Sequence, residues 1–571
     1  MRRGGAMELR FKLPYPEARA PKPFDFNFER SFRNLLLLMS SSLSFSRTFH
    51  ENGNRLREAL LFAWALLATA GVLVLAVWAS HEQQTSYNKP AGKRNLIFMV
   101  SDGMGPASLS MTRSFRQHTE GLDYGDTLTL DKHFWGTSRT RSSSSLVTDS
   151  AAGATAFSCG KKSYNGAISM LPGSNPCGTV LEAAKRAGYK TGLVVTTDIT
   201  DATPACFASH VDYRSQQDEI ALHEIGHGPL NRTVDLMFGG GRCHFLPNGT
   251  DGGCREDDID ATQMAQKDYG WNYISDRAAF DEYWEGRKEV PLPMLGLFAD
   301  TDIPFEMDRR NMNDVYPSLS EMAKTALKAL EKATEHDDKG FFLMIEGSRI
   351  DHAGHGNDPS AQVREVLEYD ATFAAVLEFL EDSKTSGVLV ATSDHETGGL
   401  SVARQVHSDY PQYLWYPEVL ANASASSEHL ARRLQEHVAK LPSQHDSMKK
   451  LKKFINEELV IPGLGISDAT EEELTTLAFY PDLAQPAFAN MISVRAQIGW
   501  STHGHSAVDV NIYSSGGPGT DVLRGNVENT DVGTFLRGYL DVDVDAITQE
   551  LNEKMGRKAI GLDAQDVVIQ P

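Results

Sequence analysis

Acidic and histidine residues follow four short apolar runs of this chain. So many carboxylates and imidazoles can share a partly buried cleft only when cations neutralise their charge. Mixed Asp and His ligands suit Zn²⁺, whereas all-oxygen sets of Asp, Glu and Thr suit Mg²⁺. The pattern therefore predicts a site for divalent cations. The runs and the residues after them are Asn95–Val100 before Asp102; Thr191–Thr196 before Asp198, Asp201 and Thr203; Gly340–Ile345 before Glu346, Asp351, His352 and His355; and Val388–Thr392 before Asp394, His395 and Glu396.

The spacing within these groups indicates which side chains can bind one ion. Asp351 and His355 are four residues apart, so one helical turn would place both on the same face. The adjacent Asp394 and His395 can converge only where the backbone leaves regular structure, as it does at a strand end. A single Asp-Gly or Asp-His pair after a strand is more typical of a turn or a cap. Four such groups in series favour metal binding, although Glu396 is also explained by turn chemistry.

A candidate nucleophile lies in the segment Val147–Phe157, which reads VTDSAAGATAF. Thr148 or Asp149 can cap a helix there and leave Ser150 in its first turn, where amide hydrogens and the helix dipole attract an anion. The motif holds no histidine that could act as a base for Ser150, so Zn²⁺ would have to lower the pKa of its hydroxyl. Taken alone, the segment is better explained as a capped helix of small residues.

Apolar runs alternate with amphipathic segments from Lys93 onward, which predicts an α/β fold. The clearest helix is Ala361–Asp382, whose apolar residues follow the 3.6-residue period; Val180–Ala187 and Ser318–Thr334 are further helices. Strands separated by helices predict a large, mostly parallel central sheet flanked by helices on both faces. Ligands bind at the carboxyl edge of such a sheet, so the candidate residues would meet in one cleft. We expect the more polar residues 403–490 to form an insertion outside the core.

Length and composition are those of a globular protein. Hydrophobic residues make up 41% and charged residues 23% of the 571 residues, which excludes a disordered, collagen-like or multi-span membrane chain. The length allows three or four domains, or one large α/β unit with insertions. A net charge of −21 argues against nucleic acid as a partner. It does not argue against a phosphate substrate, because bound metal ions invert the local field.

Six segments together resemble the alkaline phosphatase family, over roughly residues 93 to 540 and in the family's order. They read NLIFMVSDGMG, VTDSAAGATAF, TDATPACFASHVDYR, EGSRIDHAGHGND, TSDHETGG and GHSAVDV. The resemblance implies an alkaline phosphatase-like catalytic domain over residues 93–545. It also implies hydrolysis of phosphate monoesters at alkaline pH, with a broad substrate range, through a phosphoserine on Ser150. Two Zn²⁺ and one Mg²⁺ would be the cofactors, and a homodimer the assembly.

The resemblance also implies a role for each site residue. His505 is preferred to His503 as a ligand because GHSAVDV matches the family's His-x-x-x-Asp-Val pattern. Arg214 would clamp phosphate, since its planar fork can grip two nonbridging oxygens. Asp201 is expected beside the Mg²⁺ ligands, and His352 stands where family members carry lysine or histidine, which leaves the identity of the third metal open. The implied ligands are Asp351, His355 and His505 for one Zn²⁺; Asp102, Asp394 and His395 for the second; and Asp102, Thr203 and Glu346 for Mg²⁺.

Two other functions fit parts of the pattern. A phosphodiesterase or sulfatase would share the superfamily core, but Ser150 in place of threonine or cysteine, together with Arg214, favours monoesters. A membrane-tethered binding protein without activity would lack at least one ligand, and none is missing from the motifs.

An uncharged apolar segment, Ala59–Ala79, precedes the catalytic region. Its 21 residues, at about 1.5 Å rise each, would cover the roughly 30 Å hydrocarbon core of a bilayer. A buried core helix and a cleaved signal peptide are the alternatives. Core helices rarely stay apolar on every face for this length, and a signal peptide normally has a shorter leader. We therefore expect a transmembrane anchor at residues 58–80, after a disordered cytosolic tail at 1–57, and a C-terminal tail at 546–571.

Charge predicts the orientation of this anchor. Residues 1–57 contain 11 Lys or Arg against 5 Asp or Glu, so the positive-inside rule places them in the cytosol and the later residues in a lumen. Three N-glycosylation sequons, at Asn231, Asn248 and Asn422, all follow the segment. The chain looks most like the fungal vacuolar, membrane-anchored members of the family. Together these features predict a glycosylated, single-pass type II protein of the vacuolar membrane with a luminal catalytic domain.

All five cysteines also follow the apolar segment. Cys243 and Cys254 would close a short loop, and Cys159 with Cys177 is the natural second pair. Cys206 lies in an apolar stretch and is typical of a buried thiol. Spacing alone does not determine the pairing.

Overall fold

The computed structural model describes residues 61–71, 92–441 and 448–555. The chain divides into two units, Met1–Gln84 and Thr85–Pro571. In the first unit, residues 61–71 are helical and exposed. Within the described ranges, no helix is both long and apolar enough to cross a membrane. The rest of the predicted anchor, the predicted tail at 1–57 and residues 556–571 lie outside the described residues.

Ten strands of the second unit form one sheet, in the order β14-β2-β13-β10-β1-β9-β5-β6-β8-β7. In this described sheet only β13 runs antiparallel to its neighbours, so the predicted mostly parallel sheet is confirmed. The strands are β1 (Arg94–Val100), β2 (Phe134–Arg139), β5 (Lys190–Asp198), β6 (Leu236–Gly240), β7 (Asn272–Ile274), β8 (Met294–Leu297), β9 (Phe341–Glu346), β10 (Ser386–Thr392), β13 (Val510–Ser514) and β14 (Gly525–Glu528).

The four strands predicted from the sequence lie side by side at the centre of this sheet. β10 pairs with β1, β1 with β9 and β9 with β5, all in parallel. The register sets Val100 opposite both Thr392 and Glu346, so three of the strands end at one level. The polar residues that follow these strands therefore emerge at one edge of the sheet.

Helices cover both faces of the sheet. The side chains of a strand point alternately to the two faces, so each face carries apolar residues that helices bury. Leu96, Phe98 and Val100 of β1 pack with residues of α5, α6, α20 and α21, whereas Ile97 and Met99 pack with residues of α3, α12 and α14 on the other face. The bounds are α3 (Pro106–Glu120), α5 (Ser150–Cys159), α6 (Val180–Arg186), α7 (Ala202–Ala208), α8 (Gln217–Ile225), α9 (Ala261–Asp268), α10 (Arg277–Asp281), α11 (Glu306–Arg309), α12 (Leu319–Ala333), α13 (Arg349–His355), α14 (Pro359–Asp382), α20 (Asn529–Leu540) and α21 (Val544–Lys554). The predicted domain boundary at residue 545 falls within α21.

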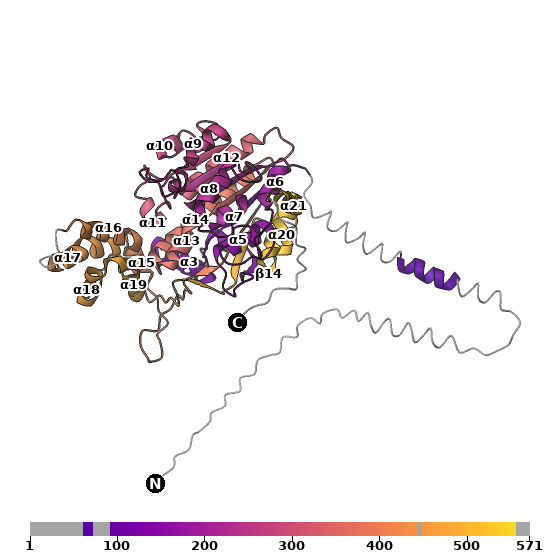
Figure 1. Ribbon diagram of the computed structural model, residues 1–571. Helices are drawn as coiled ribbons and strands as arrows, with labels where there is room; N and C mark the ends of the chain where they lie inside the picture. The colour runs from indigo at the N-terminus through magenta and orange to yellow at the C-terminus, as the bar shows by residue number, and fades with distance from the viewer. Residues whose placement is uncertain (1–60, 72–91, 442–447, 556–571) are drawn as a thin grey trace, which may run out of the picture. The chain divides into compact units, whose positions relative to one another are not determined.

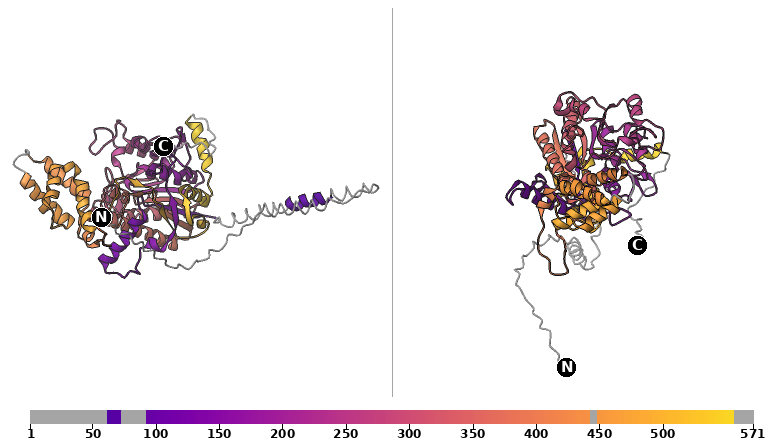
Figure 2. Two further views of the ribbon diagram at one scale, coloured as in Figure 1. Left: turned by 90° about the horizontal axis from the view of Figure 1, so that it is seen from below. Right: turned by 90° about the vertical axis from the view of Figure 1, so that its left-hand side faces the viewer.

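A group of helices lies between the short strands β11 (Glu396–Thr397) and β12 (His505–Ser506) and adds no strand to the described ten-stranded sheet. It has its own apolar cluster, to which Met111 and Phe115 of α3 also belong. Figures 1 and 2 show these helices as a lobe beside α3 and α13. They are α15 (Pro417–Asn422), α16 (Ser427–Ala439), α17 (Met448–Phe454), η3 (Ile455–Leu464), α18 (Glu471–Phe479), η4 (Pro481–Leu483) and α19 (Ala484–Ala496).

Both expected disulfides are present. Cys159 is bonded to Cys177, and Cys243 to Cys254. Cys206 is a buried free thiol beside α5, as predicted. Disulfides of this kind are typical of oxidising compartments.

Candidate active site

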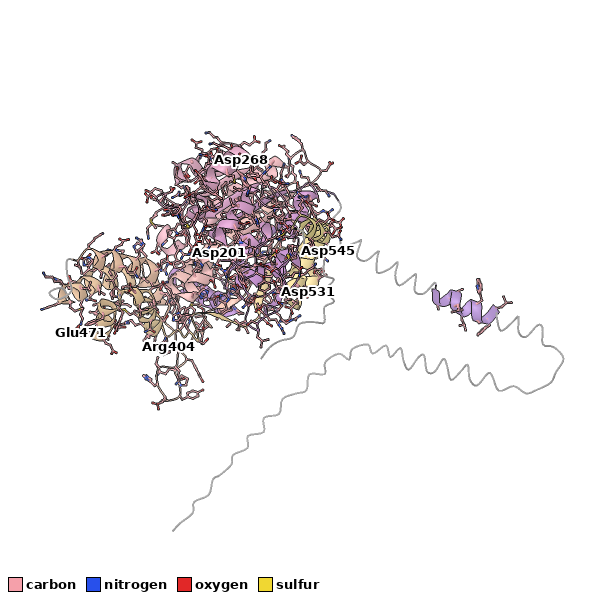
Figure 3. All side chains as sticks on the ribbon, in the orientation of Figure 1. Asp201, Asp268, Arg404, Glu471, Asp531 and Asp545 are labelled. Atoms are coloured by element: carbon pink, nitrogen blue, oxygen red, sulfur yellow. A yellow bond between two sulfur atoms is a disulfide. The ribbon has the colours of Figure 1, made fainter. Side chains whose placement is uncertain are left out.

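The predicted site residues meet at the carboxyl edge of the four central strands. Asp102 follows β1, Glu346 is the last residue of β9, and Asp394 and His395 follow β10. After β5, Asp201 caps α7 by accepting a hydrogen bond from the amide of Ala202 at 2.7 Å. Figure 3 labels Asp201 in the body of the second unit, apart from Glu471 on the helical lobe.

Ser150 is the first residue of α5, and only 3% of its surface is exposed. Asp149 caps this helix by accepting a hydrogen bond from the amide of Ala152 at 3.0 Å. The Ser150 hydroxyl lies 3.1 Å from Nε2 of His395. Gly153 lets α5 lie close to Asp394, the residue before His395, because a Cβ on Gly153 would lie only 2.9 Å from the Cβ of Asp394.

The first candidate metal group consists of Asp102, Asp394 and His395, all buried. Nε2 of His395 lies 3.1 Å from Oδ2 of Asp394 and 3.6 Å from Oδ1 of Asp102. The amides of Gly103 and His395 donate to Oδ1 of Asp394, at 3.3 and 3.0 Å. Its other oxygen, Oδ2, is therefore left for a cation.

The second group consists of Asp351, His395 and His505, and the predicted ligand His355 lies beside it. Nε2 of His355 lies 3.2 Å from Oδ2 of Asp351, and Nε2 of His505 lies 3.7 Å from Oδ1 of the same carboxylate. Nδ1 of His355 donates to the carbonyl of His503, and Nδ1 of His505 donates to the carbonyl of Thr148. These bonds turn both Nε2 atoms toward the site, in the way that metal-binding histidines are usually oriented.

Four buried oxygens of the predicted ligands lack a hydrogen-bond partner among the described residues. An unpaired buried oxygen is unfavourable by roughly 1–3 kcal/mol, so four together indicate a missing cationic partner. Three of them form the all-oxygen set predicted for Mg²⁺. The residues present therefore fit the metals implied by the sequence. The atoms are Asp102 Oδ1, Thr203 Oγ1, Glu346 Oε2 and Asp394 Oδ2.

The pKa values of these groups reflect the concentration of negative charge. Burial, together with the charges of Asp201 and Asp394, raises the pKa of Glu346 to about 8. Burial also raises the pKa of Asp102, together with the charges of Asp394 and Asp351. Burial opposes ionisation of Asp351 too, but His355, His395 and His505 outweigh it and lower its pKa. Bound divalent cations would favour the ionised form of every carboxylate here.

Arg214 reaches the edge of the site and is held by two carboxylates. Its Nη2 donates to Oδ1 of Asp201 at 2.8 Å, and its Nη1 lies 3.6 Å from Oδ2 of Asp149. About a third of its side chain, 36%, is exposed, so the guanidinium can still contact a ligand. Burial lowers the pKa of Arg214, but the charges of Asp201 and Asp149 outweigh it, and the pKa is raised.

The comparisons with known proteins agree with this geometry. Residues 93–542 match the family model described as "Alkaline phosphatase". The chain belongs to the alkaline phosphatase family. It is 56% identical over 479 residues to the repressible alkaline phosphatase of Saccharomyces cerevisiae, covering 81% of this chain and 84% of the yeast protein. It is 47% identical over 496 residues to the alkaline phosphatase of Schizosaccharomyces pombe, covering 86% and 88%.

A solved structure shares the fold. The cold-active alkaline phosphatase of Shewanella sp. superposes with a TM-score of 0.63 at 29% identity, covering 78% of this chain and 99% of that protein. The large mixed sheet flanked by helices is therefore an alkaline phosphatase fold.

His352 of this alkaline phosphatase lies beside the site but not against Asp201. Its Nδ1 is 3.2 Å from Oδ2 of Asp302, and the described side-chain hydrogen bonds of Asp201 are with Arg214 and Ala202. Burial lowers the pKa of His352, but Asp302 outweighs it and raises the pKa to about 9. His352 thus pairs with Asp302, which the motifs did not indicate because Asp302 follows a different strand, β8.

Thr397 is a second residue that the sequence analysis missed. Its hydroxyl donates to Oδ1 of Asp351 and lies 3.2 Å from Nδ1 of His395, so it links the two metal groups. Its position in the TSDHETGG segment was the available signal. Glu396 next to it accepts hydrogen bonds from the amides of Gly399 and Leu400, which is turn chemistry.

Proposed function

We propose that this protein hydrolyses phosphate monoesters at alkaline pH, with a broad substrate range, through a phosphoserine on Ser150. The proposal is carried by one observation: the Ser150 hydroxyl lies 3.1 Å from His395 Nε2, beside buried ligand oxygens of which four have no hydrogen-bond partner among the described residues. Membership of the alkaline phosphatase family supports the same chemistry.

Two Zn²⁺ and one Mg²⁺ are the proposed cofactors. Bound there, they would neutralise the charge that develops on the nucleophile, the phosphoryl group and the leaving oxygen. The proposed ligands are Asp351, His355 and His505 for one Zn²⁺; Asp102, Asp394 and His395 for the other; and Asp102, Thr203 and Glu346 for Mg²⁺.

The remaining steps belong to the protein's own residues. Oγ of Ser150 gives up its proton to water and attacks phosphorus, while the bond to the leaving oxygen breaks on the opposite side and that oxygen takes up a proton from solvent. The guanidinium of Arg214, fixed by Asp201 and Asp149, grips two nonbridging oxygens, and the positive end of α5 faces the same anion. Water then enters on the side that the leaving group vacated and releases phosphate from Ser150. Because this water must lose a proton, the rate should rise with pH.

The test is Ser150→Ala in the full-length chain, assayed with an aryl phosphate. We expect the loss of a nucleophile to lower kcat by on the order of 10³-fold or more. Acid-quenched wild type should carry phosphate on the peptide containing Ser150. Ser158→Ala, a buried serine of the same helix, is the matched control and should retain activity. Turnover of a diester or a sulfate ester in place of the monoester would favour the related phosphodiesterase or sulfatase instead.

We further propose a homodimer anchored in the vacuolar membrane through residues 58–80, with a glycosylated, luminal catalytic domain. The apolar segment, the basic residues before it and the sequons after it support this topology. The two disulfides support an oxidising lumen. Protease protection in sealed vacuoles, glycosidase digestion and light scattering of the detergent-solubilised chain test the topology, the glycans and the dimer in turn.

A further inference from the structure

A cavity of about 420 Å³ lies where the metal-binding helix α13 meets the helical lobe. This volume is within the range of small-molecule sites. Its lining includes Arg349, His352 and His355 of α13, Glu428 of α16, Gln485 of α19, and His503. Nε2 of His355 also lies 3.2 Å from Asp351 of the second candidate metal group, so the cavity borders the candidate site.

A row of side chains connects the nucleophile to this cavity. Ser150 contacts His395, whose ring stacks on that of His505 with centroids 3.5 Å apart. Nε2 of His505 lies 3.1 Å from Nε2 of His355, which lines the cavity. Ser150 and the cavity therefore lie at opposite ends of the row.

In an in-line displacement, the nucleophile and the leaving oxygen lie on opposite sides of phosphorus. With Ser150 at one end, the leaving group projects toward the end at His355. We propose that this cavity is the leaving-group subsite, and that Gln485 and Glu428 select neutral, hydroxyl-bearing leaving groups such as polyols and sugars. This inference rests on the proposed phosphomonoesterase function.

The charges around the cavity favour a neutral occupant because they are paired with one another. Arg349 Nη2 donates to Glu428 at 2.7 Å and lies 3.7 Å from Asp302, while His352 lies 3.2 Å from Asp302. Neither an anionic nor a cationic leaving group would find an uncompensated partner here.

Hydrogen-bonding groups nevertheless remain available in the cavity. The Glu428 side chain is 42% exposed, so its carboxylate can accept from a hydroxyl. The side-chain amide of Gln485 makes no hydrogen bond within the described residues and can both donate and accept. A hydroxyl-rich group matches this set.

The part of the cavity that the helical lobe contributes is held in place by residues outside the lobe. The first turn of α16 is held by two core carboxylates: the amide of Ser427 donates to Asp358 at 2.7 Å, and the amide of Ser426 donates to Asp308 at 3.1 Å. Glu428 is therefore positioned before any substrate binds, which preorganises the subsite.

The experiment compares glycerol 1-phosphate and 3-phosphoglycerate, which differ by a hydroxymethyl and a carboxylate, with phenyl phosphate as the reference. In the full-length chain, Gln485→Ala should lower kcat/KM for glycerol 1-phosphate relative to phenyl phosphate by about 3- to 10-fold, as expected for one hydrogen bond. Glu428→Gln removes the negative charge that pairs with Arg349, so Arg349 can attract the carboxylate of 3-phosphoglycerate. The variant should therefore raise kcat/KM for 3-phosphoglycerate relative to glycerol 1-phosphate. A general loss of structure could not produce this gain.

Gln435→Ala is the matched control, since Gln435 is exposed on α16 and its amide bonds the carbonyl of Pro481, away from the cavity. It should change neither ratio. If both ratios stay constant in the two cavity variants while phenyl phosphate is still hydrolysed, the subsite is refuted and the proposed function stands. If the wild type hydrolyses none of the three esters, the proposed function itself fails.

Discussion

The imidazole rings of His395 and His505 stack with their centroids 3.5 Å apart and their planes inclined by 22°. Burial and the neighbouring charge of His395 lower the pKa of His505 to about 4. Its Nδ1 donates to the carbonyl of Thr148, so the unprotonated Nε2 faces the site. Because a metal binds neutral imidazole, this stack would prepare His505 for the proposed role as a Zn²⁺ ligand.

Removing metal should destabilise this protein as well as inactivate it. The carboxylates of Asp102, Glu346 and Asp394 then face one another without a cation. The free energy of metal binding also no longer stabilises the folded state. At metal concentrations about 1,000 times Kd, the loss amounts to roughly 4 kcal/mol. Differential scanning calorimetry after chelation and dialysis should show a lower Tm, restored by Zn²⁺ with Mg²⁺. An unchanged Tm and activity would contradict the metal centre.

Arg214→Lys should weaken phosphate binding. Lysine cannot reproduce the planar fork that Asp201 and Asp149 hold in place. The loss of a charge-assisted hydrogen bond predicts a fall in kcat/KM of roughly 10- to 100-fold, with weaker inhibition by inorganic phosphate. Steady-state kinetics with an aryl phosphate measure both. Arg186→Lys on α6, where Glu550 and Leu230 are the partners, is the control and should match wild type.

Thr397→Val should reduce metal affinity while keeping the shape of the side chain. The hydroxyl bonds Asp351 and lies against His395, and outer partners of this kind are typically worth 10- to 100-fold in metal binding. Chelator competition should show weaker Zn²⁺ binding, and excess Zn²⁺ should restore activity. Thr119→Val on the exposed side of α3 should leave the competition curve unchanged. Equal Zn²⁺ affinity in the Thr397 variant would count against this link.

Glu365→Gln should stabilise the protein at alkaline pH. Glu365 is buried in α14, and burial raises its pKa to about 8, above the unfolded value of about 4.3. The folded state therefore binds the extra proton between these values, and its stability falls as pH rises through that window. Glutamine removes this dependence on pH. The free energy of unfolding of the variant should therefore rise relative to that of wild type from about pH 5 to pH 8, and should rise no further above pH 8.

Urea unfolding at pH 5, 7 and 9 measures the difference in free energy of unfolding between the Glu365→Gln variant and wild type, which we expect to reach a few kcal/mol. Glu381→Gln, on the exposed end of the same helix, is the control and should show a constant difference at the three pH values. A Glu365→Gln difference that is also independent of pH would show that this carboxyl does not couple to folding.

The sequence by itself determined the local elements and the chemical types of the site. Alternation of apolar runs placed β1, β5, β9 and β10 within a few residues, and the 3.6-residue period placed α14, because these patterns depend only on neighbours along the chain. Family motifs supplied the residue types that the edge of the sheet brings together.

Only the tertiary structure decided how separate segments meet. The pairing of His352 with Asp302, the link through Thr397 and the cavity between α13 and the lobe all join residues that are distant in sequence. No periodicity records such contacts, because they depend on the strand order and on where the inserted helices pack. The order β10-β1-β9-β5 brings the carboxylates together, and the burial that follows makes them unfavourable without cations.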